Sequence, residues 1–161
     1  MFDGSTETFE MIKRPNTAEV IATVGDKILL LNQEQPNRPK PFTSLPGGRC
    51  EEGEDPLVAT QRELLEETGY TSSDWELWQA ERPQNKIIWT VYTYIARNCR
   101  LEQPPKLDAG EKITAKLITF DEFILLSDDE DFYELELKKY LFRARLDAKS
   151  REDLHNLLFK K

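Results

Sequence analysis

Three glutamates stand at the spacing that places side chains on one side of a helix. Glu63, Glu66 and Glu67 occupy positions i, i+3 and i+4, so a helix of 3.6 residues per turn would project them within an arc of about 100°. Carboxylate oxygens are the ligands of hard cations, and Mg²⁺ is commonly held by a few carboxylates together with substrate phosphates and water. The cluster therefore points to a magnesium site that handles phosphate, although glutamate is also a frequent helix former on solvated faces.

The flanking residues define the helix that would carry this acidic face. Asp55 followed by Pro56 is typical of an N-cap and a first-turn proline, and Gly69 is typical of the residue after a helix end. We therefore expect a helix from Pro56 to Thr68. Aliphatic residues on another arc of this helix would seat it against a sheet; they are Leu57, Val58, Leu64 and Leu65.

The remaining elements are predicted from alternating β-branched, apolar and turn-forming stretches. Before the helix, strands are expected at 17–24 and 27–31, joined by a tight turn, and the proline-bearing stretch 32–40 is a loop. After the helix, strands are predicted at 75–80, 87–96 and 114–119, and helices from Asp121, over 132–146, and after a cap at Ser150. This order describes an α/β or α+β fold with helices on a mixed central sheet.

The length of the chain fits one domain. A chain of 161 residues can bury one substantial core and is short for two. We expect residues 1–161 to form a single domain, with a short N-terminal arm at 1–14 and C-terminal helices at 132–161.

The charge of the chain bears on its partners. A net charge of −8 and a pI near 4.8 argue against capture of nucleic acid or of an anionic membrane surface, because both would repel the protein. A phosphate-bearing substrate would therefore need local cations. Arg82, Lys86 and Arg97 flank the predicted aromatic strands and are candidates to bind substrate.

The location of the protein is inferred from weaker signals. No apolar stretch approaches the length of a membrane helix, and the acidic N-terminus is not typical of a secretory signal. Cys50 and Cys99 form no CxxC pair, which favours two incidental thiols in a reducing compartment. We expect a cytoplasmic protein.

The segment around the glutamates resembles the Nudix box, Gx5Ex7REUxEExGU, in which U is a bulky aliphatic residue. Every fixed position is matched, by Gly48, Glu54, Arg62, Glu63, Glu66, Glu67 and Gly69. Such a match would arise by chance on the order of a few times in a million in a chain of this composition. Only Tyr70 departs from the pattern, where an aliphatic residue is usual.

The resemblance implies a Nudix-type α/β/α sandwich with a mixed central sheet and a set of site residues. Its metal ligands would be Gly47, through the backbone carbonyl, together with Glu63, Glu66 and Glu67. Arg62 and Glu54 would support the catalytic centre by orienting a carboxylate and by tying the loop to the helix. The general base is left open between Glu111, Asp108 and Glu66. The cofactor would be Mg²⁺, with Mn²⁺ as a substitute.

The family resemblance implies water attack on a nucleoside diphosphate linked to another moiety. The segments 14–33 and 107–113 resemble Nudix hydrolases of ADP-ribose and nucleotide sugars, so these small-molecule nucleotides are the expected substrates. Alternatives are a house-cleaning pyrophosphohydrolase of nucleoside triphosphates and a non-catalytic nucleotide-binding module. Related enzymes of the ADP-ribose group form dimers through a longer N-terminal region, whereas fourteen residues precede Pro15 here; a homodimer stays open.

Overall fold

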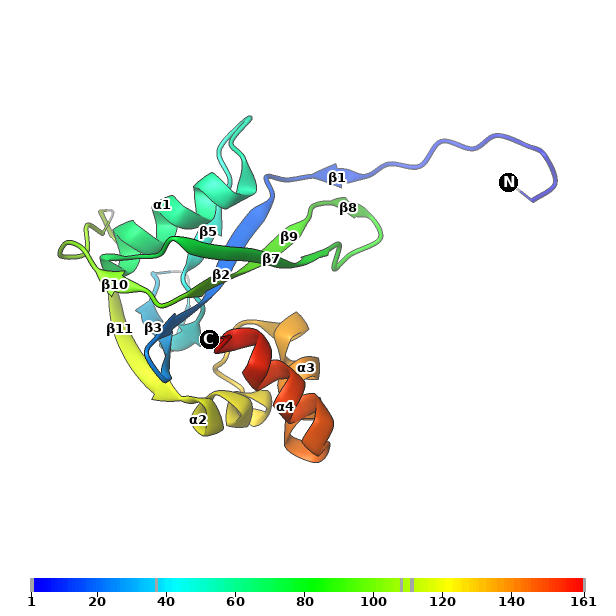
Figure 1. The fold of residues 1–161 in the computed structure, drawn as a ribbon. Coiled ribbons are helices and arrows are strands. Elements are labelled where there is room, and N and C mark those ends of the chain that lie inside the picture. Colours follow the sequence, from blue (N-terminus) through cyan, green and yellow to red (C-terminus); the bar gives the residue numbers. More distant parts are fainter. Residues whose placement is uncertain (1, 37, 108, 111, 161) are drawn as a thin grey trace.

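The computed structural model describes residues 2–36, 38–107, 109–110 and 112–160, and Figure 1 shows their arrangement in layers. Within this part of the chain, a mixed sheet of seven strands carries α1 on one face and α2, α3 and α4 on the other. The strands are β1 (Ile12–Lys13), β2 (Thr17–Val24), β3 (Lys27–Glu34), β4 (Phe42–Ser44), β5 (Gly47–Arg49), β6 (Tyr70–Thr71), β7 (Asp74–Glu81), β8 (Ile87–Ile88), β9 (Val91–Arg97), β10 (Arg100–Leu101) and β11 (Lys112–Thr119). The helices are α1 (Pro56–Thr68), α2 (Phe120–Leu125), α3 (Leu135–Leu146) and α4 (Ala148–Leu158).

The main sheet runs in the order β11-β3-β2-β9-β7, with β4 paired to β3 and β5 paired to β2. The pairing of β2 with β9 is parallel, whereas β2 pairs antiparallel with β3 and β5. Because side chains alternate across a strand, neighbouring residues of β2 enter different cores. Val20 packs in a cluster with Leu64 of α1, whereas Ile21 packs in a cluster with Phe123 and Leu141. The predicted sandwich with a mixed sheet is confirmed.

Helix α1 has the bounds that the sequence predicted. Asp55 accepts a hydrogen bond from the N–H of Leu57 over 2.9 Å, and Pro56 is the first helical residue. Gly69 ends the helix with φ of 76°, and a Cβ there would lie 1.9 Å from the carbonyl oxygen of Gln103. Glycine is therefore required at this end for both its backbone conformation and its size.

The predicted strand 87–96 is broken in the structure, because its two halves pair with different neighbours. β8 pairs with β1 of the N-terminal arm, whereas β9 pairs with β2 and β7. At the break, the N–H of Thr90 donates to the side chain of Asn16 over 2.9 Å. This side-chain contact interrupts the regular strand pairing.

The predicted helix 132–146 begins later, at Leu135. The preceding backbone pairs with β4 instead, with the N–H of Tyr133 donating to the carbonyl of Thr43 over 2.8 Å. The last helix, expected after Ser150, begins at Ala148 because Asp147 caps it by accepting from the N–H of Ser150 over 2.7 Å. In the described part of the chain, no helix has the length and apolar character needed to cross a membrane.

Candidate active site on helix α1

Arg62 lies at the centre of the acidic face of α1. Its Nε donates to Oε1 of Glu54 over 3.2 Å. Its Nη1 donates to Oε1 of Glu63 over 2.9 Å and to Oε2 of Glu66 over 3.1 Å. The hydrogen bond that Arg62 donates to Glu54 raises the pKa of Arg62, and the charge of Glu63 adds to this effect. One guanidinium therefore holds three carboxylates of the helix and of the loop before it.

Glu54 fastens the loop before α1 to the helix. Besides pairing with Arg62, its Oε2 accepts from the N–H of Glu51 over 2.8 Å. The hydrogen bond from Arg62 holds the pKa of this carboxyl below its ordinary value, and the N–H of Glu51 acts in the same direction. Arg62 also donates to the carbonyl of Arg49 over 3.3 Å. The expected tie between loop and helix is present.

Two glycines bring the backbone close to the carboxylates of α1. The N–H of Gly47 donates to Oε2 of Glu67 over 2.8 Å, and Glu67 is buried. Gly47 has a φ of 153°, and a Cβ there would lie 2.5 Å from the carbonyl oxygen of Ala18. A Cβ on Gly48 would lie 2.4 Å from Oε1 of Glu63. At Gly48, the space that a side chain would fill is thus occupied by the carboxylate of Glu63.

The donor set fits a hard divalent cation in its chemistry. The carboxylates of Glu63 and Glu67 lie at a backbone turn with no Cβ at Gly48, which leaves room for close approach. Among the described residues, however, no three acidic, histidine or cysteine side chains surround one point as an assembled metal site does. The carboxylates of Glu63 and Glu66 instead contact Arg62. A bound cation would compete with that guanidinium for their oxygens.

Both candidates for a general base on the β10–β11 loop, Asp108 and Glu111, lie outside the described residues. The two ends of the loop are described. The N–H of Lys106 donates to the carbonyl of Glu66 over 2.7 Å, and Lys112 pairs with Glu34 in the β11–β3 ladder. The first part of the loop therefore lies against the end of α1, and its last part lies beside the end of β3.

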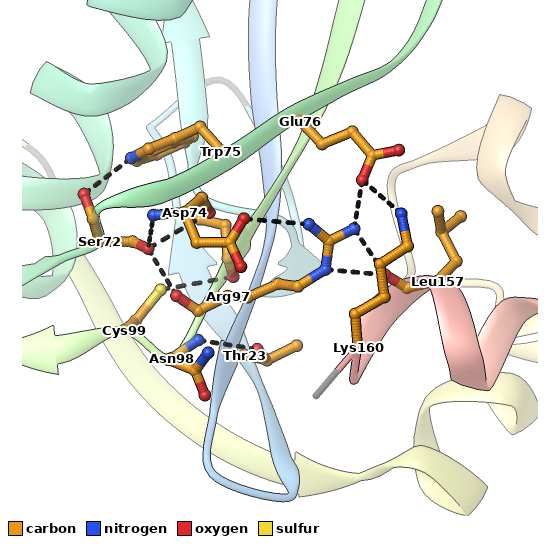
Figure 2. Close-up of polar contacts among 11 residues, drawn as sticks. Thr23, Ser72, Asp74, Trp75, Glu76, Arg97, Asn98, Cys99, Leu157 and Lys160 are labelled. Carbon is orange, nitrogen blue, oxygen red and sulfur yellow. Dashed lines mark hydrogen bonds and ion pairs between the residues drawn. The ribbon is translucent and has the colours of Figure 1, made fainter.

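The three cations predicted to bind substrate have different surroundings. Arg82 and Lys86 are exposed on the β7–β8 loop. The prediction for Arg97 is corrected, because its side chain is 4% exposed and faces α4. It pairs with Asp74 over 3.2 Å and donates through Nε to the carbonyl of Leu157 over 2.9 Å (Figure 2).

Arg97 is therefore part of a network that fastens the C-terminal helix to the sheet. Its Nη2 pairs with Oε2 of Glu76 over 2.5 Å, and the same oxygen pairs with Lys160 over 2.9 Å (Figure 2). The spacing of charges along the chain could not show that the Arg97 side chain turns to the face covered by α4. Its guanidinium is committed to carboxylates and a carbonyl, and it is not a substrate ligand in this arrangement.

A buried pair of carboxyl groups was missed by the sequence reasoning. Glu19 of β2 is 8% exposed and accepts from the hydroxyl of Thr93 over 2.8 Å. Its carboxyl is hydrogen-bonded to that of Glu134, which also accepts from the N–H of Leu45 over 3.2 Å. Burial raises the pKa of Glu19, and burial together with the charge of Glu19 raises the pKa of Glu134. The one signal for this pair was an acidic residue inside the apolar run TAEVIATV.

Comparison with known proteins decides the family. The family model described as NUDIX domain matches residues 13–139, which spans most of the chain and all of the site above. The chain belongs to the NUDIX family. It is a Nudix hydrolase, and hydrolases of this family generally need a divalent metal and act on small-molecule nucleotides.

Three known proteins illustrate the similarity. A "Methanol dehydrogenase activator" of Bacillus methanolicus is 30% identical over 138 residues, which cover 82% of this chain and 73% of that protein. An "ADP-ribose pyrophosphatase" of Bacillus subtilis (strain 168) is 26% identical over 135 residues, with the same coverage of 82% and 73%. A solved structure described as an ADP compounds hydrolase matches with a TM-score of 0.70 at 20% identity, covering 87% of this chain and 76% of that chain. At that identity the last similarity bears on the fold.

Proposed function

We propose that this Nudix hydrolase uses Mg²⁺ to cleave the pyrophosphate of a nucleoside diphosphate linked to another moiety, with ADP-ribose or a nucleotide sugar as substrate. The observation that carries the proposal is the contact of Gly47 and Gly48 with Glu67 and Glu63. This contact places the turn that contains Gly47 against the helix that carries both carboxylates. The relative named as an ADP-ribose pyrophosphatase supports the choice of substrate.

Each residue of the site has a separate task in the proposed reaction. The carbonyl of Gly47 and the carboxylates of Glu63, Glu66 and Glu67 would hold the metal. Bound there, Mg²⁺ would neutralise diphosphate charge and make a bound water more acidic. Arg62 would orient Glu63 and Glu66 through the hydrogen bonds described above, so that less reorganisation is needed when substrate binds.

Three acidic residues are candidates to accept the proton of the attacking water. Glu66 lies on α1, whereas Glu111 and Asp108 belong to the β10–β11 loop, which starts at the end of α1. A carboxylate with access to the attacking water is sufficient for general base catalysis. Separate substitution of each of the three by its amide, with the pH dependence of kcat as readout, identifies the base. The variant that loses the ionisation on the acidic side of the profile marks it.

A substrate panel with Mg²⁺ or Mn²⁺ tests the proposed function. ADP-ribose and nucleotide sugars should yield a nucleoside monophosphate, whereas a house-cleaning enzyme would release pyrophosphate from nucleoside triphosphates. Cleavage of triphosphates alone would overturn the substrate class. Binding of ADP-ribose without cleavage at high Mg²⁺ would overturn the proposed hydrolysis and indicate a non-catalytic nucleotide-binding module.

Three further features are proposed for the whole protein. The described chain is proposed to work as one domain, since α1 to α4 all cover the same sheet. A cytoplasmic location is supported by two free, buried thiols, Cys50 and Cys99. A homodimer is supported by apolar side chains exposed on the N-terminal arm, such as Phe9 and Ile12. Light scattering on the chain with and without residues 1–14 tests the last point, because loss of the arm should then yield monomers.

A further inference from the structure

Arg38, in the loop between β3 and β4, is held between two aromatic rings. Its Cζ lies 4.1 Å from the ring centroid of Phe42 and 4.3 Å from that of Tyr133. The two rings come from distant parts of the chain and contact each other at a centroid distance of 5.7 Å. Contacts of this kind hold a guanidinium by cation–π attraction.

The hydrogen-bond donors of this guanidinium have no partner among the described residues. Its side chain contacts the faces of the two rings. Its charge also lowers the pKa of Glu134, although burial of that carboxyl has the larger, opposite effect. Stacking occupies the faces of a guanidinium, whereas its five N–H groups lie in its plane and suit a bidentate oxyanion. Arg38 is therefore positioned by the rings and keeps its donors for another group.

Arg38 lines two adjoining hollows, which share the loop segment 38–41. The first has a volume of about 340 Å³ and includes both rings, with Glu130 and Asp131 on its wall. The second has a volume of about 290 Å³ and extends to Gly110 and Lys112. Sites for small ligands begin near these volumes, at roughly 300 Å³.

The charges of the second hollow favour an anion. Arg38, Lys40 and Lys112 line it, and Glu34 is the acidic residue among its described lining residues. Glu34 is paired with Lys112 over 2.7 Å, so two cationic side chains face its remaining space. In a protein of net charge −8, such a local excess of positive charge distinguishes this surface.

Two stretches of chain connect the second hollow to the proposed reaction centre. Gly110 on its wall belongs to the loop that leaves from the end of α1. Pro41 on its wall precedes Gly47 by six residues, a span of at most about 22 Å in extended chain. A substrate bound at the turn with Gly47 can therefore reach toward Arg38.

We propose that Arg38, assisted by Lys40, binds a second anionic group, a phosphate or carboxylate, on the moiety that the substrate carries beyond its diphosphate. The inference rests on the proposed function, because it assigns a specificity residue to that reaction. Among the proposed substrates, the enzyme then prefers a nucleotide sugar whose sugar is charged over neutral nucleotide sugars and over ADP-ribose, whose distal ribose is neutral.

Direct binding tests the site without turnover. Titration of the full chain with inorganic phosphate is followed by the Nε–H resonance of Arg38 in NMR spectra, which is assigned by its absence in R38K. The resonance should shift in a saturable manner. Arg38→Gln should abolish the phosphate-dependent shifts in the β3–β4 loop, whereas Lys149→Gln, a matched charge change on α4, should preserve them. If the Arg38 resonance does not shift when phosphate is added, the inference is overturned.

Turnover tests the assigned specificity with a matched substrate pair, a nucleotide sugar and the nucleotide uronic acid that differs from it by one carboxylate. R38Q should raise KM for the nucleotide uronic acid by about tenfold or more and leave its kcat nearly unchanged. KM for the neutral nucleotide sugar should also stay nearly unchanged. R38K, which retains charge and side-chain bulk, should give a smaller rise. Thermal unfolding of each variant confirms that the chain still folds.

The outcomes separate the two proposals. If no diphosphate is cleaved but phosphate shifts the Arg38 resonance, the proposed function fails and the anion site stands. If diphosphates are cleaved and R38Q affects both members of the pair equally, the proposed function stands and Arg38 is not a specificity residue.

Discussion

The N–H of Gly47 donates to Oε2 of Glu67 over 2.8 Å, and this bond joins a turn of the sheet to the last turn of α1. Both residues are proposed metal ligands, one through its carbonyl and one through its carboxylate. Their separation is therefore set by the folded chain. Such positioning reduces the reorganisation required when an ion and a substrate bind.

Glu67→Gln should abolish most of the turnover. An amide oxygen can still accept from Gly47, so the fold should persist, but the negative charge that attracts a cation is lost. We expect a fall in kcat of roughly hundredfold or more, since loss of residues that merely support a ligand costs about 10- to 100-fold. Release of AMP from ADP-ribose measures it. Glu52→Gln, an exposed change on the loop before α1, serves as control. Wild-type turnover in E67Q would show that Glu67 is not a metal ligand.

Gly48→Ala should weaken metal binding while the fold persists. The added methyl group would lie 2.4 Å from Oε1 of Glu63, so the carboxylate must move away from the turn. The Mg²⁺ concentration required for half-maximal activity should rise about tenfold, within the range seen when metal sites lose a supporting contact. A Mg²⁺ titration of activity checks this, with thermal unfolding as the measure of folding. An unchanged Mg²⁺ requirement would show that Glu63 does not act from this position.

Arg62→Lys should separate charge from geometry. Lysine keeps a positive charge near Glu54, Glu63 and Glu66 but cannot reproduce the fork of donors that contacts them together. We expect kcat to fall by roughly 10- to 100-fold, with a small effect on stability because these groups are partly exposed. Steady-state kinetics and chemical denaturation give the two quantities. A large loss of stability at full kcat would make Arg62 a purely structural residue.

The pair Glu19 and Glu134 should make the protein less stable as the pH rises. A folded-state pKa that lies above the unfolded one means that the folded chain binds its proton more tightly. This stability is fully present below the unfolded pKa of about 4.3 and is lost as pH rises through the raised value. The midpoint of thermal unfolding, measured between acid and alkaline pH, reports the trend.

Glu134→Gln isolates this contribution. The amide can donate to Glu19 and accept from Leu45 without ionising, so E134Q should flatten the pH dependence and raise Tm at alkaline pH by roughly 2–5 °C. Glu136→Gln, an exposed change two residues further along in α3, should leave the wild-type profile intact. Parallel profiles for E134Q and the wild type would show that Glu134 does not carry the titration.

Arg97→Leu should destabilise the protein and leave catalysis largely intact at low temperature. Its loss removes the link from Asp74 and Glu76 to the carbonyl of Leu157. Breaking a buried ion pair costs about 3–5 kcal/mol, and because both partners are partly exposed we expect about 2 kcal/mol. Denaturant unfolding measures it. A raised KM with unchanged stability would show that Arg97 binds substrate. Arg82→Gln, a change at an exposed arginine, is the control.

The sequence alone determined those features that depend on near neighbours in the chain. Asp55, Pro56 and Gly69 fixed the bounds of α1 because caps and glycine ends act within one turn of a helix. The spacing of Glu63, Glu66 and Glu67 placed them on one face for the same reason. Arg62 and Glu54 were identified through the family pattern, and their contact is found in the structure.

Tertiary structure decided what depends on partners far along the chain. Phe132 could not be known to leave the helical pattern, because the edge of β4 that binds its neighbours lies about ninety residues away. The role of Arg97 was misjudged and Glu19 was missed, because packing decides which face of a strand is covered by a helix. Burial of a carboxyl then disfavours its charged form and raises its pKa, as at Glu19. Arg38 gained its distant aromatic neighbour, Tyr133, in the same way. Local spacing thus fixed the helix with its carboxylates, whereas the folded sheet decided which charges meet substrate and which hold the layers together.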